Sequence, residues 1–189
     1  MIEPGPLFAD AAKGRSGDED RIDLPVAAYD LCLAIGTLDT VPELPEALIA
    51  IRRALRPDAL FIGAVSGGET LPMLRAAMRA ADSASPAASP HVHPRIEASA
   101  LAPLLSSAGF AMPVVDVDRV SVAYPAFDKL IDDLRGMAAT NILSARSRRP
   151  LSRPARDAAR NEFARRGDGA VTRETFEILH FAAWAPTGQ

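Results

Sequence analysis

The chain has 189 residues, of which 48% are hydrophobic and 24% charged, the profile of one globular domain with a real core. Its net charge of -3 does not suggest a nucleic-acid-binding protein, and no apolar stretch approaches the roughly 20 residues of a membrane span. A single cysteine excludes an internal disulfide, and the N-terminus shows no signal-peptide pattern, so a cytoplasmic protein is expected.

The first 28 residues are only weakly patterned. Residues 7–12 could form a helical turn, and residues 13–20 are polar and contain glycine, which indicates a loop. The acidic run Asp18-Glu19-Asp20 lies in this loop. A carboxylate there could accept hydrogen bonds from an adenine amino group or a ribose hydroxyl, although an acidic loop by itself is usually solvated surface.

Alternating strand and helix patterns begin at Tyr29. The apolar run Tyr29–Ile35 predicts a strand buried on both faces, and residues 59–65 predict a second one. Residues 42–55 carry apolar side chains at helical spacing, and residues 71–81 predict another helix with Thr70 as its N-cap. Because short links join these elements, the two strands should be adjacent and parallel, with the helices packed on the sheet faces.

The second half of the chain is predicted to complete the same domain. It begins with a loop rich in serine, alanine and proline, followed by further helices over residues 98–108, 126–137 and 155–166. Strands are predicted over residues 113–122 and 175–184, and they should pair antiparallel at the unfilled edge of the sheet. We therefore expect one domain, with a weakly patterned segment (1–28), a sheet core (29–82) and a C-terminal part (83–189).

The topology indicates where a ligand should bind. Ligands of open parallel α/β sheets bind at the C-terminal ends of the strands, here residues 34–40 and 66–70. The Gly67-Gly68 pair would let the backbone approach a ligand closely, or it is an ordinary turn. Asp39 could serve as a base near the strand end, or it is an exposed loop aspartate.

Other reactive side chains give weaker signals. His91 and His93 lie in a proline-rich loop with no third metal ligand beside them, so a lid, a substrate-facing loop or plain surface is expected rather than a metal site. His180 should be a satisfied structural histidine, and Cys32 a small buried hydrophobe. No motif of covalent catalysis is present, so no catalytic residue is assigned.

Sequence motifs beginning at Tyr29 resemble a known family. They match the second half of class I S-adenosylmethionine-dependent methyltransferases (type 11 domain), and the matching residues are Tyr29-Asp30-Leu31, Leu44-Pro45, Ala47-Leu48, Ile51, Arg53, Leu55, Pro57-Asp58 and Phe61. Later motifs resemble a subgroup, and they are Gly67-Gly68-Glu69-Thr70-Leu71, Ala108-Gly109-Phe110, Asp132-Asp133-Leu134-Arg135-Gly136-Met137, Thr140-Asn141 and Thr175-Phe176-Glu177-Ile178. That subgroup contains the malonyl-acyl-carrier-protein O-methyltransferase of biotin synthesis and the methyltransferase-like assembly factors of respiratory complex I.

The resemblance implies an α/β fold and a cofactor, S-adenosylmethionine. The fold is a Rossmann-like, mostly parallel sheet with an antiparallel last strand, N-terminally incomplete in this chain. In cofactor binding, Glu3 would bind the ribose, and Asp18 with Glu19 beside it would lie at the adenine amino group. Residues 34–38, which include Ala34, Ile35 and Gly36, would form the loop beneath the methionine portion.

Two departures from the family pattern affect the expected activity. The first strand with its Gly-x-Gly-x-Gly turn has no counterpart, and Asp39-Thr40 stand where many relatives carry His-Trp. We therefore expect weak or absent cofactor binding in this chain. The implied reaction is methyl transfer to a small-molecule, acyl-carrier or protein substrate, by in-line positioning and desolvation of the reactants.

A binding function is the alternative that the resemblance leaves open. In an assembly factor of the complex I type, the helices between residues 126 and 166 would hold a protein client. The cluster Arg146-Ser147-Arg148-Arg149 would favour an acidic partner, or it is a solvated basic loop.

Overall fold

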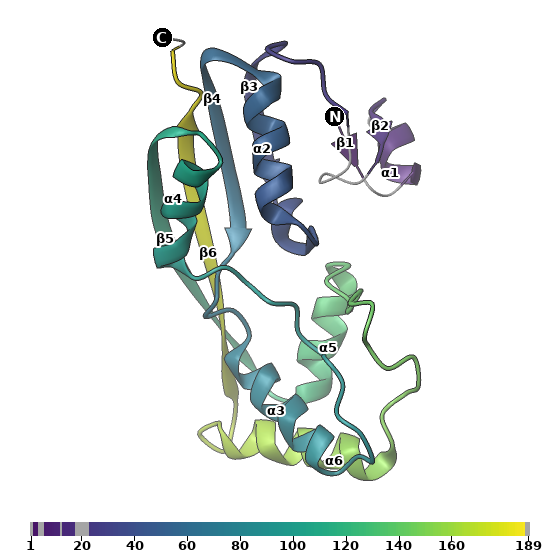
Figure 1. The fold of residues 1–189 in the computed structure, drawn as a ribbon. Coiled ribbons are helices and arrows are strands. Elements are labelled where there is room, and N and C mark those ends of the chain that lie inside the picture. Colours follow the sequence, from purple (N-terminus) through teal and green to yellow (C-terminus); the bar gives the residue numbers. More distant parts are fainter. Residues whose placement is uncertain (1, 4–5, 12, 18–22, 188–189) are drawn as a thin grey trace. The chain divides into compact units, whose positions relative to one another are not determined.

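The structure is a computed structural model, which describes residues 2–3, 6–11, 13–17 and 23–187. The chain packs as two compact units. The sheet unit consists of Met1–Gly68, Arg95–Asp118 and Ile178–Gln189, and the helical unit of Glu69–Pro94 and Arg119–Glu177. Strands β5 and β6 run through both units, so the sequence alternates between them (Figure 1).

The sheet unit contains a four-stranded sheet and two helices that face its core. In chain order its elements are β1 (Ile2–Glu3), α1 (Pro6–Ala11), β2 (Arg15–Ser16), β3 (Tyr29–Ile35), the 3-10 turn Leu38–Thr40, α2 (Leu44–Ala54), β4 (Leu55–Ser66), α4 (Ala98–Ser107), β5 (Ala111–Tyr124) and β6 (Thr172–Trp184). Strands β1 and β2 form a separate parallel pair in which Glu3 lies opposite Ser16. The short strand β2 lies where a loop was predicted.

The strand order β3-β4-β6-β5 confirms the main topological predictions. Strands β3 and β4 are adjacent and parallel, with Leu33 opposite Ile62. Strand β6 runs antiparallel to β4, with Phe61 opposite Ala183, and it lies next to β5 as predicted. Residues 55–58 extend β4 at its start, beyond the strand predicted over residues 59–65.

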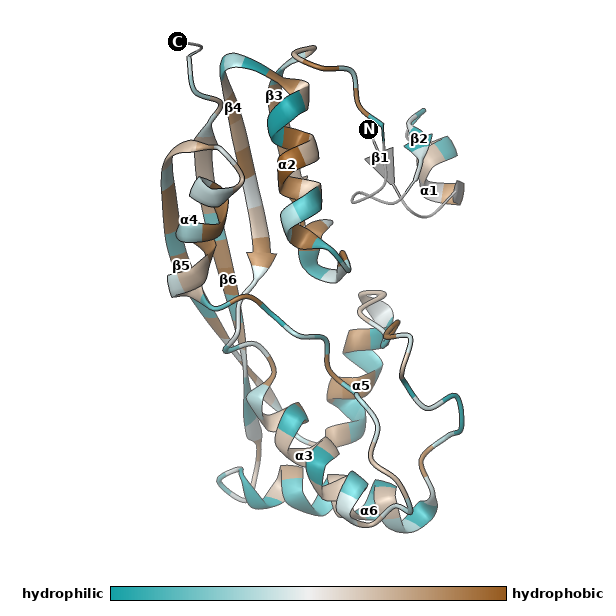
Figure 2. Ribbon diagram, in the orientation of Figure 1, coloured by the Kyte–Doolittle hydropathy of each residue, from teal (hydrophilic) through white to brown (hydrophobic). Residues whose placement is uncertain are grey.

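One face of this sheet forms the main hydrophobic core. Phe61 is fully buried, stacks on Phe110 with the ring centroids 5.1 Å apart and meets the edge of Phe181 at 4.9 Å. Helices α2 and α4 cover this face with apolar side chains that belong to the same cluster, Leu48, Ile51, Leu101 and Leu105. Figure 2 shows the hydrophobic colour along β3, β4 and β6 behind these helices.

The opposite face of the sheet is open, which corrects the prediction that β3 is buried on both sides. Side chains alternate along a strand, and the odd-numbered ones of β3 point away from α2. Leu31 is 49%, Leu33 60% and Ile35 72% exposed. The uninterrupted apolar run of β3 indicated that both faces of the strand are covered, but the described residues cover only the face toward α2.

Cys32 points into the core face and should be chemically inert. Burial raises the pKa of its thiol from 9.0 to about 11, because the thiolate loses solvation. At pH 8 this lowers the thiolate fraction about a hundredfold relative to an ordinary thiol. We expect Ellman's reagent to modify Cys32 slowly in the native protein and at the ordinary rate in guanidinium chloride. Fast modification of the native protein would contradict this burial.

The helical unit has its own core. Helices α3 (Pro72–Ser83), α5 (Phe127–Gly136) and α6 (Arg153–Arg165) enclose Met78, Leu130 and Phe163. Phe127 meets the edge of Phe163 with ring centroids 5.8 Å apart. Helix α3 belongs to this cluster, so the prediction that it packs on the sheet face is wrong. Within the described part of the chain, no helix has the length and apolar character that crossing a membrane requires.

The start of α3 is organised by buried acids of β6 rather than by Thr70. Leu71 is the N-cap residue, with a φ of 62° and no side-chain cap. Thr70 instead bonds through its hydroxyl to the backbone of Glu177, so its prediction as an N-cap is wrong. The Glu174 carboxylate accepts hydrogen bonds from Met73 N at 3.1 Å and Leu74 N at 2.8 Å. A carboxylate at this position satisfies helix N–H groups that lack partners within the helix.

Replacing Glu174 by alanine should destabilise the helical unit. The substitution leaves the amides of Met73 and Leu74 without their acceptor, which costs about 1–3 kcal/mol of unfolding free energy. Burial raises the pKa of the Glu174 carboxyl above its unfolded value of about 4.3. Ionisation of the buried carboxyl therefore lowers the stability of the folded protein at neutral pH, and protonation at lower pH removes this destabilisation. Urea unfolding from acid to neutral pH would measure both effects, and an unchanged midpoint would contradict the capping role.

Candidate functional site

The C-terminal ends of β3 and β4 are held together by Asp39. Its carboxylate accepts hydrogen bonds from Ser66 N at 2.6 Å and Ser66 Oγ at 2.8 Å. Arg95 completes an ion pair with the same carboxylate at 3.4 Å, and the Asp39 side chain is only 18% exposed. Asp39 is therefore not an exposed loop residue, because it joins the turn after β3 to the end of β4 and to the Arg95 guanidinium.

The glycine pair after β4 pairs with the backbone of Ile96. Gly68 N donates to Ile96 O at 2.9 Å, and Gly67 forms a parallel bridge with Ile96. A Cβ at position 68 would collide with the carboxylate of Glu97. That carboxylate is the end of an exposed, flexible side chain that can move aside, so this contact alone does not make glycine necessary at position 68.

The residues predicted beneath the methionine portion differ in their accessibility. Ala34 is 4% exposed and faces the core, so its side chain cannot line a cofactor site. The Ile35 side chain is 72% exposed to solvent. Gly36 has a φ of +69°, and a Cβ added there would meet no atom within 4 Å. Gly36 N donates to Ala64 O at 2.9 Å, which fixes the loop at the sheet end. Ile35 and Gly36 thus form an accessible backbone corner.

The predicted carboxylates lie in the least described part of the chain. Glu3 belongs to β1, but its side chain is outside the described part. Asp18 and Glu19 also lie outside the described residues. Their roles at the ribose and the adenine remain predictions.

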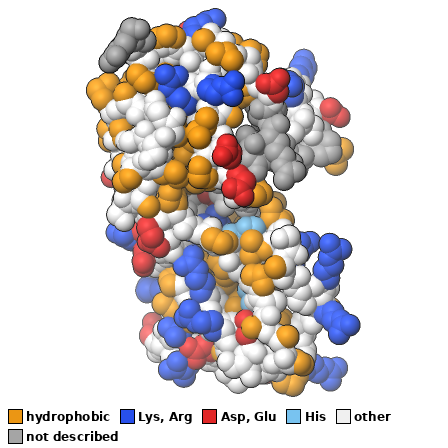
Figure 3. All heavy atoms as spheres, viewed as in Figure 1, with side chains coloured by type: hydrophobic (Ala, Val, Ile, Leu, Met, Phe, Trp, Pro, Cys, Tyr) orange, Lys and Arg blue, Asp and Glu red, His pale blue; other side chains and the backbone are white. Residues whose placement is uncertain are grey.

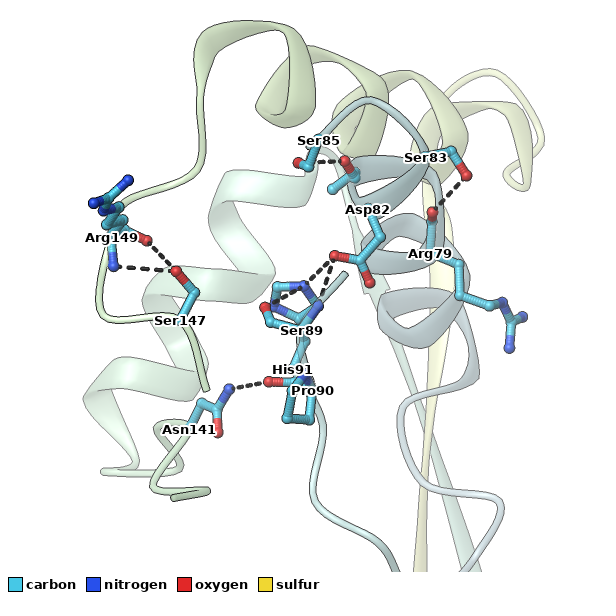
Figure 4. Close-up of polar contacts among 11 residues, drawn as sticks. Arg79, Asp82, Ser83, Ser85, Ser89, Pro90, His91, Asn141, Ser147 and Arg149 are labelled. Atoms are coloured by element: carbon cyan, nitrogen blue, oxygen red, sulfur yellow. Dashed lines mark hydrogen bonds and ion pairs between the residues drawn. The ribbon is translucent and has the colours of Figure 1, made fainter. Parts of the chain in front are cut away.

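A second polar site lies in the helical unit, and sequence patterns did not reveal it. A hollow of about 210 Å³ is lined by Arg75, Met78, Arg79, Asp82, Ser89, His91 and Val92. His91 Nε2 lies 2.9 Å from Asp82 Oδ1 and 3.4 Å from Ser89 Oγ, as Figure 4 shows. The contact forms because the loop after α3 folds back on the end of that helix, and no local motif indicates such a return.

The two predicted loop histidines and His180 have distinct environments. His91 Nε2 lies against the Asp82 carboxylate, which can only accept when ionised, so Nε2 is the donor in this contact. His93 Nε2 accepts a hydrogen bond from Ile142 N at 3.2 Å. His180 is exposed on β6, so its prediction as a satisfied structural residue is wrong. Among the residues that the structure covers, no group of three His, Cys, Asp or Glu side chains could hold a metal ion.

Comparison of the sequence with curated proteins finds two kinds of relative. The chain is 36% identical over 174 residues to "Arginine-hydroxylase NDUFAF5, mitochondrial" of Danio rerio, a match that covers 89% of this chain and 53% of the relative. It is 31% identical over 188 residues to the malonyl-[acyl-carrier protein] O-methyltransferase of Laribacter hongkongensis, covering 97% of this chain and 60% of that protein. The chain thus spans between half and two thirds of the length of these relatives. No protein-family profile matches it.

Two solved structures share the fold of this chain at low sequence identity. The YcgJ protein of Bacillus subtilis superposes with a TM-score of 0.63 at 10% identity, over 99% of this chain and 82% of that one. A SAM-dependent methyltransferase of Thermotoga maritima gives a TM-score of 0.52 at 13% identity, over 97% and 72% of the two chains. The chain therefore shares the fold of these solved structures, and its sequence is similar to the malonyl-[acyl-carrier protein] O-methyltransferases and the NDUFAF5 proteins over half to two thirds of their length.

Proposed function

We propose that the protein is an S-adenosylmethionine-dependent methyltransferase acting on a small-molecule, acyl-carrier or protein substrate. The observation that carries the proposal is the β3-β4-β6-β5 sheet with antiparallel β6, together with the 31% identity to a named O-methyltransferase. When bound, the cofactor would supply an electrophilic methyl group. The chain would then have to position an acceptor in line with it and exclude water.

The described residues fit part of such a cofactor site. Ile35 and Gly36 at the end of β3 offer an accessible backbone where a ligand can approach without meeting a side chain at position 36. Glu3, Asp18 and Glu19 would contribute the carboxylates for ribose and adenine. Ala34 would contribute only its backbone, because its side chain is in the core.

Polar groups at the strand ends leave little capacity for further ligand contacts. Asp39, Ser66 and Arg95 bond to one another, and the amide of Glu69 donates to Glu177 at 3.3 Å. The described loops therefore offer accessible backbone at Ile35 and Gly36, but few polar groups that remain available to hydrogen-bond a ligand. This supports our expectation that the 189-residue chain binds the cofactor weakly or not at all.

A binding experiment tests this proposal directly. Isothermal titration of the 189-residue protein with S-adenosylmethionine should show weak or no binding. A longer protein that includes the upstream coding sequence should bind, and Asp18→Ala in that protein should weaken binding. Micromolar binding by the short chain would contradict the expected weakness, and no binding by the longer protein would overturn the cofactor assignment.

A second reaction is favoured by the names of other relatives. The relatives at 36% and 35% identity are named arginine-hydroxylases, so hydroxylation of an arginine is a second candidate reaction, which would consume molecular oxygen together with an electron donor. Mass spectrometry of a protein acceptor separates the two reactions, because methylation adds a methylene mass and hydroxylation adds an oxygen mass. A holding or assembly role without chemistry would leave the acceptor mass unchanged.

We place the protein in the cytoplasm as part of this proposal, although those relatives are named mitochondrial.

A further inference from the structure

Charge is unevenly divided between the two units. The sheet unit contains 7 Lys and Arg against 14 Asp and Glu, a net charge of -7. The helical unit contains 14 Lys and Arg against 10 Asp and Glu, a net charge of +4. The overall value of -3 conceals this opposition.

The excess of positive charge in the helical unit comes from one segment. No acidic residue occurs between Asp133 and Asp157, whereas six arginines do. Five of these are exposed, and apart from Arg135, which pairs with Asp132, they are Arg148, Arg149, Arg153 and Arg156. We call these four the basic surface. Within the described residues their guanidinium groups form no ion pair, unlike Arg160, which bonds to Asp128 at 2.8 Å. Figure 3 shows blue side chains along the side of the helical unit.

The backbone that carries the basic surface is held in place by its own contacts. Asn141 Nδ2 donates to Pro90 O at 2.8 Å, and Ser147 Oγ accepts from Arg149 N at 3.2 Å. Ser152 Oγ then caps α6 by accepting from Ala155 N at 3.3 Å. In Figure 4 the Arg149 side chain extends away from the other labelled residues. An ordered backbone with outward guanidinium groups lowers the entropy cost of binding an anionic partner.

We propose that the basic surface docks an acidic segment of a protein substrate, an inference that rests on the proposed function in its protein-acceptor form. Guanidinium groups bind carboxylates through paired hydrogen bonds, and four unpaired ones on an ordered backbone suit a short run of Asp or Glu.

The test measures binding of a fluorescent glutamate-rich peptide to the full chain by anisotropy at low salt, without S-adenosylmethionine. Arg148→Glu with Arg149→Glu should weaken binding about tenfold or more, because two attractions become repulsions. Arg53→Glu with Arg173→Glu is the matched control, since it makes the same change of charge at arginines outside the segment. The control should retain nearly all of the affinity.

The outcomes separate this inference from the proposed reaction. Equal weakening in both double variants would show a general charge effect and overturn the docking surface. Equally tight binding of duplex DNA or of phosphatidylserine vesicles would also overturn it, because the surface would then select only for negative charge. Selective loss in the Arg148 and Arg149 variant supports docking whether or not methyl transfer is ever detected.

Discussion

Replacing Phe61 by alanine is expected to lower the unfolding free energy of the sheet unit by about 3–5 kcal/mol. The Phe61 side chain is fully buried and contacts both Phe110 and Phe181, so its removal leaves a cavity between the middle strands and the covering helices. The loss combines the transfer free energy of the ring with the dispersion contacts of the cavity wall. Urea unfolding followed by far-ultraviolet circular dichroism would measure it.

Ile62→Ala is the matched control for this prediction. Ile62 is the next residue of β4, but it is 38% exposed on the open face of the sheet. Its truncation should therefore cost about 1 kcal/mol or less, because part of the side chain is already in water. Equal losses for the two variants would contradict the assignment of the core to one face of the sheet.

The order and type of the elements could be predicted because their apolar periodicity is strong. Residues 29–35 are a strand with the predicted limits, and the predicted helix over residues 98–108 ends at Gly109, whose φ is +91°. The parallel pairing of β3 with β4 follows from short crossover links. These features depend on local sequence and on the handedness of connections.

The local site geometry could not be predicted, because it depends on contacts between distant residues. Asp39 bonds to Ser66 across 27 positions, and Glu174 reaches the amides of α3 across about a hundred. Neither pairing leaves a periodic signal in the sequence. Thr70 matched the local pattern of a cap, but the carboxylate of a β6 residue occupies that role.

The open face of the sheet was missed for a different reason. An apolar run such as Tyr29–Ile35 indicates side chains that favour burial, and it does not show which segment covers them. The hydrophobic pattern therefore predicts which side chains require burial, but it does not predict what buries them. In the described residues that requirement is met on the α2 side and unmet on the other.

The open face leads to the second large effect, which is self-association of the 189-residue protein. Paired residues of β3 and β4 point to the same side, so Leu33 and Ile62 form a continuous exposed apolar surface. Strand β3 is also the edge of the described sheet, and its outer backbone groups can pair with another strand. Extended apolar surface next to an open edge favours association between copies.

Sedimentation velocity over a range of protein concentrations would measure this association. The unmodified chain should form dimers or larger species, and Leu33→Lys with Ile62→Lys should shift it to monomer because each lysine places a charge in the apolar surface. Ile49→Lys is the control, since Ile49 is 39% exposed but lies on α2. It should leave the association unchanged. A monomeric unmodified chain at every concentration would show that the open face is tolerated in water, and equal effects of the control would show that any added charge suffices.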